Sequence, residues 1–499
     1  MMAIKELPIA WRVLALNTLA FTVCFACWML NGVLVTYLVE RGVFGWDPAQ
    51  MGVLIGVPVL TGSIFRLPVG MLTDRFGGRP VFTLLMLLCA VPMYLLGSVD
   101  SYQGYLLASL GFGLAGASFA VGIAFSSVWF TREHQGTALG IFGAGNAGAA
   151  LTVMGAPSLL RWLTDGGKEI ERWRLLPVLY AAMLVVMAGL FFLLTRNKKA
   201  EAASRRGVVE MLRPLAHARV WRFGLYYFLV FGGFVALAQW LVPYYVNVYS
   251  MTIVTAGLVT SIFSLPSGVI RALGGVLSDR LGARTVMYWT LGAIALCCLA
   301  LIFPKMEIES PGSGVMAARA GVVTEVSETV VRVGVDAYPL VARSDQAIDE
   351  RAAHLLPVVR SWHVAEVQVG RQVARRELLA RGVTNIFFQA NVWVFTVLVF
   401  VIGIAMGIGK AAVYKYIPDY FPTEVGVVGG MVGVLGGLGG FLCPIVFGYL
   451  LKGIGLWTTT WIFFFLVAMA CLAWLHVTVR RISKRDDTIE VPMPALENS

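Results

Sequence analysis

The chain has 499 residues, of which 58% are hydrophobic and only 13% are charged, about half the charged fraction of a soluble domain. Apolar runs of about 20 residues recur along nearly the whole length, which predicts an all-α polytopic membrane protein rather than an outer-membrane barrel. The formal net charge of +11 gathers beside the ends of apolar runs, so it indicates cytoplasmic segments and not a nucleic-acid partner.

The apolar runs predict about 12 membrane spans. They lie near residues 13–39, 50–72, 80–98, 102–130, 136–162, 173–195, 222–248, 252–277, 285–304, 388–417, 425–451 and 456–478. The first residues, "MMAIKELPIAWR", lack a cleavable secretory pattern and lead into the first span. Basic segments at 196–207 and 480–485 follow the sixth and twelfth spans, so we expect both termini in the cytoplasm.

The spans fall into two sets of six that echo each other. The stretches "RLPVGMLTDRFGGR" and "RALGGVLSDRLGAR" align without gaps, each between the second and third spans of its half. Such duplication is typical of two-lobed transporters, which bind substrate near the bilayer midplane between the repeats. We expect an N-terminal lobe over 1–195, a cytoplasmic linker over 196–221, a C-terminal lobe over 222–304 and 388–479, and a cytoplasmic tail over 480–499.

Arginines lie inside the second and eighth spans. Arg66 and Arg271 each precede a loop acid by eight residues, which places them roughly 12 Å into the membrane along a helix. A cation at that depth costs several kcal/mol and needs a partner. An ion pair with a fixed carboxylate is one interpretation, but the spans contain essentially no mid-membrane Asp or Glu. We favour a planar substrate anion that accepts paired N–H bonds.

Related glycine-rich stretches occupy the fifth and eleventh spans, "GIFGAGNAGAALTVMGAP" and "GGMVGVLGGLGGFLCP". Small residues let transmembrane helices approach closely, and packing is one explanation. The other is a ligand site, because missing side chains let the backbone approach a small ligand. Asn146 lies among the first set of glycines and offers a neutral donor.

An insertion at 305–387 interrupts the symmetry between the ninth and tenth spans, and topology predicts that it is external. The alternation in "VVTEVSETVVRVGV" predicts strands, whereas the pattern over 349–382 predicts a helix. We expect this insertion to be peripheral to transport.

In the tenth span, Lys410 lies eight residues before Pro418, at a depth like that of the arginines. A buried lysine can release its proton, so Lys410 is the candidate for proton coupling; a lysine whose amine reaches the membrane surface is the alternative. No catalytic set is visible, none of the 5 histidines lies mid-span, and the 7 cysteines form no metal-ligand framework. We therefore expect no enzyme activity, no metal and no cofactor.

Each half contains the pattern Gly-x-x-x-Asp-Arg-x-Gly-x-Arg, from Gly70 to Arg79 and from Gly275 to Arg284. This pattern resembles the loop signature of the major facilitator superfamily, whose members rock two six-helix lobes between inward-open and outward-open states. The resemblance implies 12 transmembrane helices in two pseudo-symmetric lobes. It also implies inter-lobe ion pairs that break on opening. The residues implied in gating are Asp74, Arg75, Arg79, Asp279, Arg280 and Arg284.

The glycine-rich stretches, with one arginine in each of spans two and eight, resemble the nitrate/nitrite porter family. The resemblance implies that the two arginines clasp the anion, that Asn146 hydrogen-bonds it, and that aromatic rings flank its plane. The implied substrate-binding residues are Arg66, Phe119, Gly143, Gly145, Asn146, Tyr227, Phe231, Arg271, Gly433 and Gly436.

The expected function is therefore nitrate and nitrite transport by alternating access. Lys410 favours proton-coupled nitrate import, with nitrate/nitrite antiport as the alternative and transport of another small anion as the second alternative. The expected partners are nitrate, nitrite, protons and the lipid bilayer, with no nucleic acid. We expect a functional monomer in the bacterial inner membrane.

Overall fold

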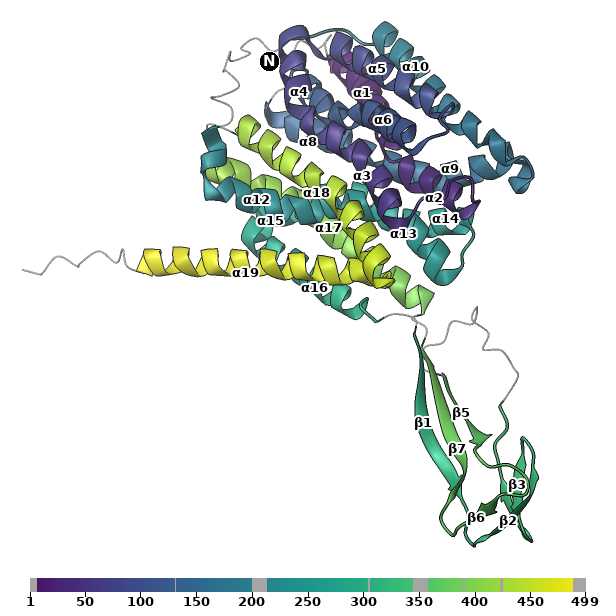
Figure 1. Ribbon diagram of the computed structural model, residues 1–499. Coiled ribbons are helices and arrows are strands. Elements are labelled where there is room, and N and C mark those ends of the chain that lie inside the picture. The colour runs from purple at the N-terminus through teal and green to yellow at the C-terminus, as the bar shows by residue number, and fades with distance from the viewer. Residues whose placement is uncertain are drawn as a thin grey trace, which may run out of the picture. The chain divides into compact units, whose positions relative to one another are not determined.

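The computed structural model describes residues 7–130, 132–199, 213–303, 306–343, 358–388, 391–421 and 425–487. The chain divides into two compact units (Figure 1), a helical unit of Met1–Ile302 with Thr396–Ser499 and a β unit of Phe303–Phe395. The β unit is slightly longer than the insertion expected at 305–387.

The first half of the helical unit contains six spans. They are formed by α1 (Leu7–Trp28) with α2 (Asn31–Glu40), α3 (Pro48–Ile64) with α4 (Arg66–Phe76), α5 (Gly78–Leu96), α6 (Tyr102–Gly113) with α7 (Ser118–Ser127), α8 (Arg132–Gly143) with α9 (Gly148–Leu163), and α10 (Leu175–Leu194). Short 3₁₀ segments join two of these pairs, η1 (Leu114–Ala117) between α6 and α7, and η2 (Ala144–Ala147) between α8 and α9.

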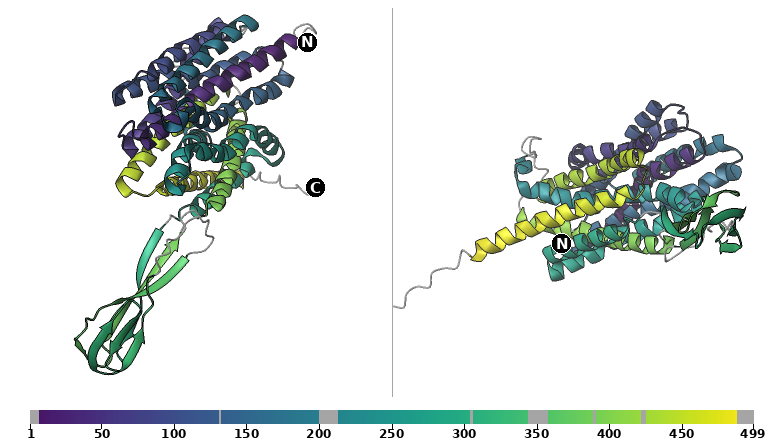
Figure 2. Two further views of the ribbon diagram at one scale, coloured as in Figure 1. Left: turned by 90° about the vertical axis from the view of Figure 1, so that its right-hand side faces the viewer. Right: turned by 60° about the horizontal axis from the view of Figure 1, so that its bottom comes forward.

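The second half repeats this arrangement. Its spans are α12 (Ala218–Tyr227) with α13 (Gly233–Tyr249), α14 (Ile253–Val269) with α15 (Arg271–Leu281), α16 (Ala283–Ala300), α17 (Val392–Tyr420), α18 (Val425–Ile454) and α19 (Thr459–Asp487). Among the described residues, eleven helices are long and apolar enough to cross a membrane, and α14 with the following helix, bent by 50°, makes up to 12. The predicted fold class of 12 helical spans is confirmed, and the helices run roughly side by side (Figure 2).

Breaks in the helices position the arginines. In each half the second span is interrupted just before its arginine, at Phe65 between α3 and α4 and at Ile270 between α14 and α15. The π-helical segment η6 (Phe228–Gly232) interrupts the seventh span, between α12 and α13. Irregular backbone at membrane depth is tolerated where protein or a cavity surrounds it, and it often marks functional sites.

One end of the helical unit is held together across the halves. Asp47 accepts a hydrogen bond from the Gln50 backbone N–H and caps α3. The same carboxylate forms a 2.8 Å ion pair with Lys452 of α18, and the hydrogen bond from Lys452, together with that cap, lowers the pKa of Asp47. A side chain at Gly52 would overlap the Pro444 carbonyl, so α3 and α18 pack closely here. We call this the Asp47 end and the opposite one the Asp74 end.

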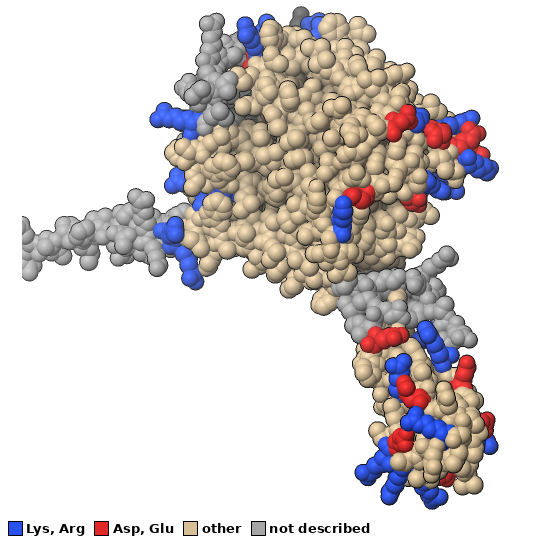
Figure 3. All heavy atoms as spheres, viewed as in Figure 1, with Lys and Arg blue, Asp and Glu red and all other residues tan. Residues whose placement is uncertain are grey.

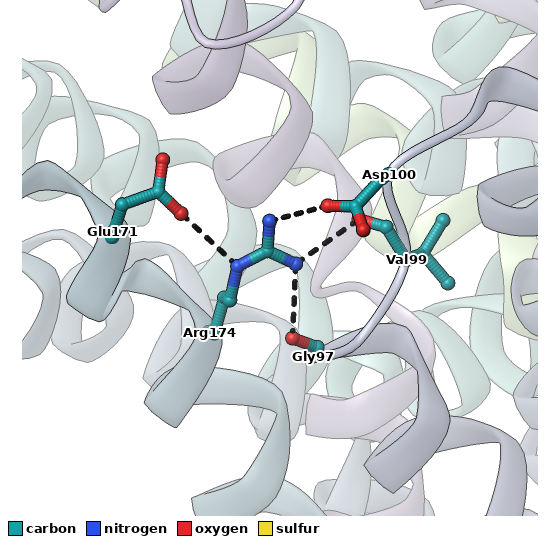
Figure 4. A network of polar contacts seen from close by, with 5 residues as sticks. All are labelled: Gly97, Val99, Asp100, Glu171 and Arg174. Atoms are coloured by element: carbon teal, nitrogen blue, oxygen red, sulfur yellow. Dashed lines mark hydrogen bonds and ion pairs between the residues drawn. The ribbon is translucent and has the colours of Figure 1, made fainter.

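Loops of the first half are joined to one another at the Asp47 end by Arg174 (Figure 4). Its Nη2 donates to Asp100 at 2.5 Å, its Nε donates to Glu171 at 3.1 Å, and its Nη1 donates to the carbonyls of Gly97 and Val99 at 3.2 Å each. The one guanidinium thus connects the α5–α6 loop with the start of α10.

The β unit consists of two antiparallel sheets. One has the strand order β1 (Met306–Met316), β7 (Leu378–Phe388), β5 (Val358–Ala365), and the other β4 (Asp336–Pro339), β3 (Val330–Val333), β2 (Gly321–Val326), β6 (Gln372–Val373). In register, Met306 lies opposite Phe388 and Val358 opposite Phe387. A small apolar core, which includes Val323, fills the unit.

The strands predicted in "VVTEVSETVVRVGV" are confirmed by β2 and β3. The helix predicted over 349–382 is wrong for 358–382, where β5, β6 and the start of β7 lie; residues 349–357 lie outside the described residues. The valines of this stretch are β-branched and fit a pleated surface better than a helix. Gly370 has φ +90°, which turns the chain before β6.

Candidate functional site

Arg66 is the first residue of α4 and lies buried in the middle of the helical unit, with 5% of its surface exposed. Its Nη1 donates to the Gly433 carbonyl of α18 at 3.1 Å, and its Nε approaches the Gly116 carbonyl at 3.5 Å. Its Nη2 has no partner in the described part of the chain, and no Asp or Glu there forms an ion pair with it. The structure therefore leaves one face of a buried cation unsatisfied.

Arg271 occupies the matching position at the start of α15. Its guanidinium carbon lies 5.4 Å from the ring centre of Tyr414 and 5.8 Å from that of Phe119. Phe119 is also 5.4 Å from the guanidinium carbon of Arg66, so both cations flank one ring. They are close enough for their like charges to interact unfavourably. The structure thus brings together the two arginines that the sequence repeat singled out.

Aromatic rings surround Arg66 on further sides. The ring centre of Phe231, in η6, lies 5.1 Å from its guanidinium carbon and that of Trp28 lies 5.8 Å away. Phe231 stacks on Tyr227 with centroids 5.0 Å apart and planes 6° apart. The Tyr227 hydroxyl is buried and has no partner among the described residues. Phe119, Tyr227 and Phe231 are therefore all part of the same site.

Asn146 lies in the 3₁₀ segment η2, where the fifth span is irregular. It is 2% exposed, and its Nδ2 donates to the Gly143 carbonyl at 2.9 Å. Its Oδ1 has no partner in the described ranges. Helix α14 of the second half lies close to Asn146, because a side chain at Gly268 of α14 would lie 3.7 Å from the Asn146 Cβ. Asn146 thus faces the contact between the halves with unused hydrogen-bonding capacity.

The four predicted glycines fall into two kinds. Side chains at Gly145 and Gly436 would overlap Phe21 and Tyr227 respectively, so these two glycines serve helix packing. A side chain at Gly143 would meet no described atom within 4 Å. At Gly433 it would lie 3.9 Å from Arg66 Nη1, and the Gly433 carbonyl already accepts a hydrogen bond from that nitrogen.

Lys410 of α17 is buried, with 1% of its surface exposed. Its Nζ lies 3.3 Å from the Ser267 hydroxyl and 3.2 Å from the ring centre of Phe234. The charge of Arg271 acts on it unfavourably. The described ranges contain no acidic partner for Lys410, so it adds a third unneutralised positive charge beside the arginines.

The loop-motif residues do not meet across the halves in this conformation. Asp279 pairs with Lys415 of α17 at 2.8 Å, within the second half. Arg79 donates from Nε to the Phe192 carbonyl at 2.7 Å, within the first half. Among the described residues, the ion pair between Asp47 and Lys452 is the only one that joins the halves. The motif residues Asp74, Arg75, Arg280 and Arg284 form no ion pair within that part of the chain.

Sequence reasoning missed Trp28, Tyr414 and Ser267. Tyr414 follows Lys410 by four residues on α17, so helical spacing places both on one face and gives a signal for it. Trp28 donates from its indole to the Pro58 carbonyl at 2.8 Å while its ring lies beside Arg66. No motif points to Trp28, because its role depends on how α1 packs on α3.

Comparisons with known proteins agree with this architecture. The family model of the Major Facilitator Superfamily matches residues 16–328 and 378–497. Solved structures of similar fold include a bacterial homolog to human lysosomal transporter Spinster (TM-score 0.62, 15% identity, 95% of this chain and 97% of that one). Nucleoside transporter NupG is another (TM-score 0.60, 12% identity, 94% and 98%).

Curated relatives narrow the comparison. A protein of Thermus thermophilus named "Probable nitrate/nitrite antiporter NarK1" is 39% identical over 486 residues, which cover 97% of this chain and 94% of the relative. "Probable nitrate/nitrite transporter NarK2" of Mycobacterium tuberculosis H37Rv is 32% identical over 302 residues, or 60% and 74%. The "Nitrite extrusion protein" of Bacillus subtilis strain 168 is 22% identical over 444 residues, or 89% and 88%.

Proposed function

The chain belongs to the nitrate/nitrite porter family of the major facilitator superfamily, and from this premise we propose that it carries nitrate and nitrite across a cell membrane by alternating access. The observation that carries the proposal is the pair of guanidiniums, Arg66 and Arg271, that flank Phe119 without an acidic partner among the described residues. The relatives' names supply the candidate substrates.

The anion is held between the two arginines. Arg66 uses Nη1 and Nε on backbone carbonyls, so Nη2 is left to donate to a ligand. Hydrogen bonds from charged donors contribute about 1.5–3 kcal/mol each. A bound oxyanion would also neutralise cations that cost several kcal/mol at this depth. Asn146 Nδ2 donates one N–H to the Gly143 carbonyl, and its second N–H provides a neutral donor to the anion from the fifth span.

Ring geometry favours a flat anion. Phe119 and Phe231 both lie against the Arg66 guanidinium, with ring centres 5.4 and 5.1 Å from its central carbon. A planar, weakly hydrated anion can lie between aromatic faces, whereas the tetrahedral oxygens of sulfate or phosphate would press against them. This supports nitrate and nitrite over the alternative of another small anion.

Alternating access needs a gate at each end of the helical unit. Asp47, Lys452 and the close packing of α3 on α18 close the Asp47 end in this conformation. The loop motifs of α4 and α15 lie at the other end, where Asp279 pairs with Lys415 and Arg79 bonds the Phe192 carbonyl, each within its own half. The motif residues exchange such partners for contacts across the lobes when that end closes. The basic segments near residues 196 and 480 support a cytoplasmic Asp74 end and cytoplasmic termini. We also propose a location in the bacterial inner membrane, with the monomer as the functional unit.

Coupling is proposed to run through protons. Lys410 has no carboxylate to hold its charge within the described residues, and its Nζ lies 3.3 Å from the Ser267 hydroxyl. Lysine, unlike arginine, can act as a proton carrier in a buried site. Nitrate/nitrite exchange is the second candidate, because the Thermus thermophilus relative is named as an antiporter.

Counterflow in proteoliposomes tests both candidates. Purified protein is reconstituted, and uptake of labelled nitrate is measured with internal nitrite, with an inward proton gradient, or with neither. Saturable uptake of labelled nitrate that unlabelled nitrate and nitrite inhibit supports the proposed function. Stimulation of this uptake by the proton gradient supports import coupled to protons. Stimulation by internal nitrite alone would replace symport by exchange. Absence of nitrate-dependent flux in all three conditions would refute the proposed substrates.

A further inference from the structure

A second basic recess lies at the Asp74 end of the second half, away from the two arginines of the candidate site. Its walls come from α12, the first turn of α16, the end of α17 and the second half of α19. The recess is lined by Arg222, Tyr226, Arg284, Tyr416, Tyr420 and Thr478, among others. None of the residues that line it is acidic.

Arg222 is the central cation of this recess. Only 8% of its surface is exposed, and its guanidinium carbon lies 5.3 Å from the ring centre of Phe223. Within the described ranges it forms no ion pair. Its side chain lines the recess, where an anion can accept hydrogen bonds from the guanidinium.

Two tyrosine hydroxyls in the same recess are also unused. Tyr226 is 0% exposed and Tyr416 is 6% exposed, and neither hydroxyl has a partner among the described residues. The ring of Tyr416 is fixed by stacking on Phe223, with centroids 5.2 Å apart and planes 7° apart. A buried hydroxyl left without a partner costs about 1–3 kcal/mol. Both hydroxyls can donate to an oxygen ligand.

Arg284 adds a second positive charge from the first turn of α16, where the helix dipole also favours an anion. Figure 3 shows Lys and Arg with almost no Asp or Glu on the visible face of the end toward which α19 extends. The recess is partly open to the outside, and the space enclosed within it is about the size of one water molecule. A ligand here is therefore a single charged group at the mouth of the recess, with the rest of the molecule outside the protein.

We propose that this recess binds a phosphate group, supplied by the headgroup of an anionic phospholipid or by free phosphate. Two arginines and two tyrosine hydroxyls match the oxygens of phosphate, which accepts several charge-assisted hydrogen bonds. Basic pockets between transmembrane helices at the cytoplasmic side bind lipid headgroups in this way. Exposed Trp289 on α16 and Trp474 on α19 offer apolar surface for an acyl chain.

A phosphate bound here joins α12, α16, α17 and α19. Tyr226 and Tyr416 belong to the same helices as Tyr227 and Tyr414, which meet edge to face at 5.1 Å in the anion site. Binding in the recess therefore steadies the packing of α12 on α17 that positions those two rings. Anionic lipid is expected to raise the thermal stability of the protein even in the absence of nitrate.

The test uses the full chain, purified in a neutral detergent. Melting temperature and bound mass by native mass spectrometry are measured with phosphatidylglycerol, with diacylglycerol of the same acyl chains, and with inorganic phosphate. Phosphatidylglycerol is expected to bind and to raise the melting temperature, whereas diacylglycerol does not. An equal effect of inorganic phosphate identifies free phosphate as a sufficient ligand; an effect of phosphatidylglycerol alone identifies the lipid headgroup. No shift with either phosphate source would overturn the proposal.

Variants locate the site. Arg222→Gln should weaken phosphate or lipid binding about tenfold, and Arg161→Gln, which removes the same charge from an exposed position on α9 of the other half, should leave it unchanged. Equal binding by the two variants would overturn the proposal. Tyr416→Phe removes a hydroxyl that lacks a partner, so the variant should melt at or above the wild-type temperature without ligand and show a smaller ligand-induced rise. A full rise in Tyr416→Phe would contradict the role given to that hydroxyl.

Discussion

Replacing Arg66 by lysine keeps the positive charge and removes the planar fork, so it tests how the anion is held. In the structure, Arg66 bonds the carbonyls of Gly433 and Gly116 with Nη1 and Nε and has Nη2 left for a ligand. A lysine amine concentrates its donors on one atom and cannot serve both the carbonyls and an anion in this geometry.

The expected loss in Arg66→Lys is about one charge-assisted hydrogen bond, or about 1.5–3 kcal/mol. With a factor of ten for each 1.4 kcal/mol, nitrate affinity should fall about 10- to 150-fold. Calorimetry of nitrate binding to the purified protein measures this directly. Arg161→Lys is the matched control, because Arg161 lies exposed on α9, and its affinity should equal that of the wild type. An Arg66→Lys protein that binds nitrate as tightly as the control would refute the hydrogen bond from Arg66 Nη2 to the anion.

Three further outcomes are expected. Lys410→Gln should bind nitrate no more tightly than the wild type, since it removes a cation from beside Arg271, and uptake should no longer respond to an inward proton gradient; a preserved response would contradict the coupling role. Asp47→Asn breaks an exposed ion pair, whose contribution is small, and should raise labelling of an engineered cysteine inside the Asp47 end only slightly. Because the pKa of Asp47 is lowered, its contribution is present above the ordinary carboxyl range and is lost as the pH falls through the lowered pKa. The ratio of this labelling between the variant and the wild type should therefore not change between about pH 5 and 8, although the labelling of each protein rises with pH because the thiolate is the reactive form. Gly436→Ala should lower the melting temperature because its side chain overlaps a ring, whereas Gly143→Ala, which meets no described atom within 4 Å, should not; equal melting temperatures would contradict the division of these glycines.

The span pattern and the arginine pair could be predicted from the sequence because lipid imposes them. A run of about 20 apolar residues has one stable conformation in a bilayer, and a cation within such a run is conspicuous. Because Arg271 occupies in the second half the position that Arg66 has in the first, the sequence alone identifies both members of the pair. Their meeting at Phe119 follows from the two-lobed architecture.

Other features depend on packing that no local pattern records. Trp28 lies beside Arg66 only because α1 crosses α3 there, and the broken helices before the arginines occur at ordinary residues, Phe65 and Ile270. The helix predicted over 349–382 is wrong for 358–382. The spacing of apolar residues there is compatible with both a helix and a strand, and the β-branched valines favour strands. The partner of Asp279, Lys415, depends on how α17 packs beside α15 in this conformation.

The most direct measurement is an experimental structure of the protein with nitrate bound. We expect planar density beside Phe119 within hydrogen-bonding distance of the guanidiniums of both Arg66 and Arg271. An anion bound elsewhere, or arginines that meet acidic side chains of the protein in place of the ligand, would contradict the proposed site.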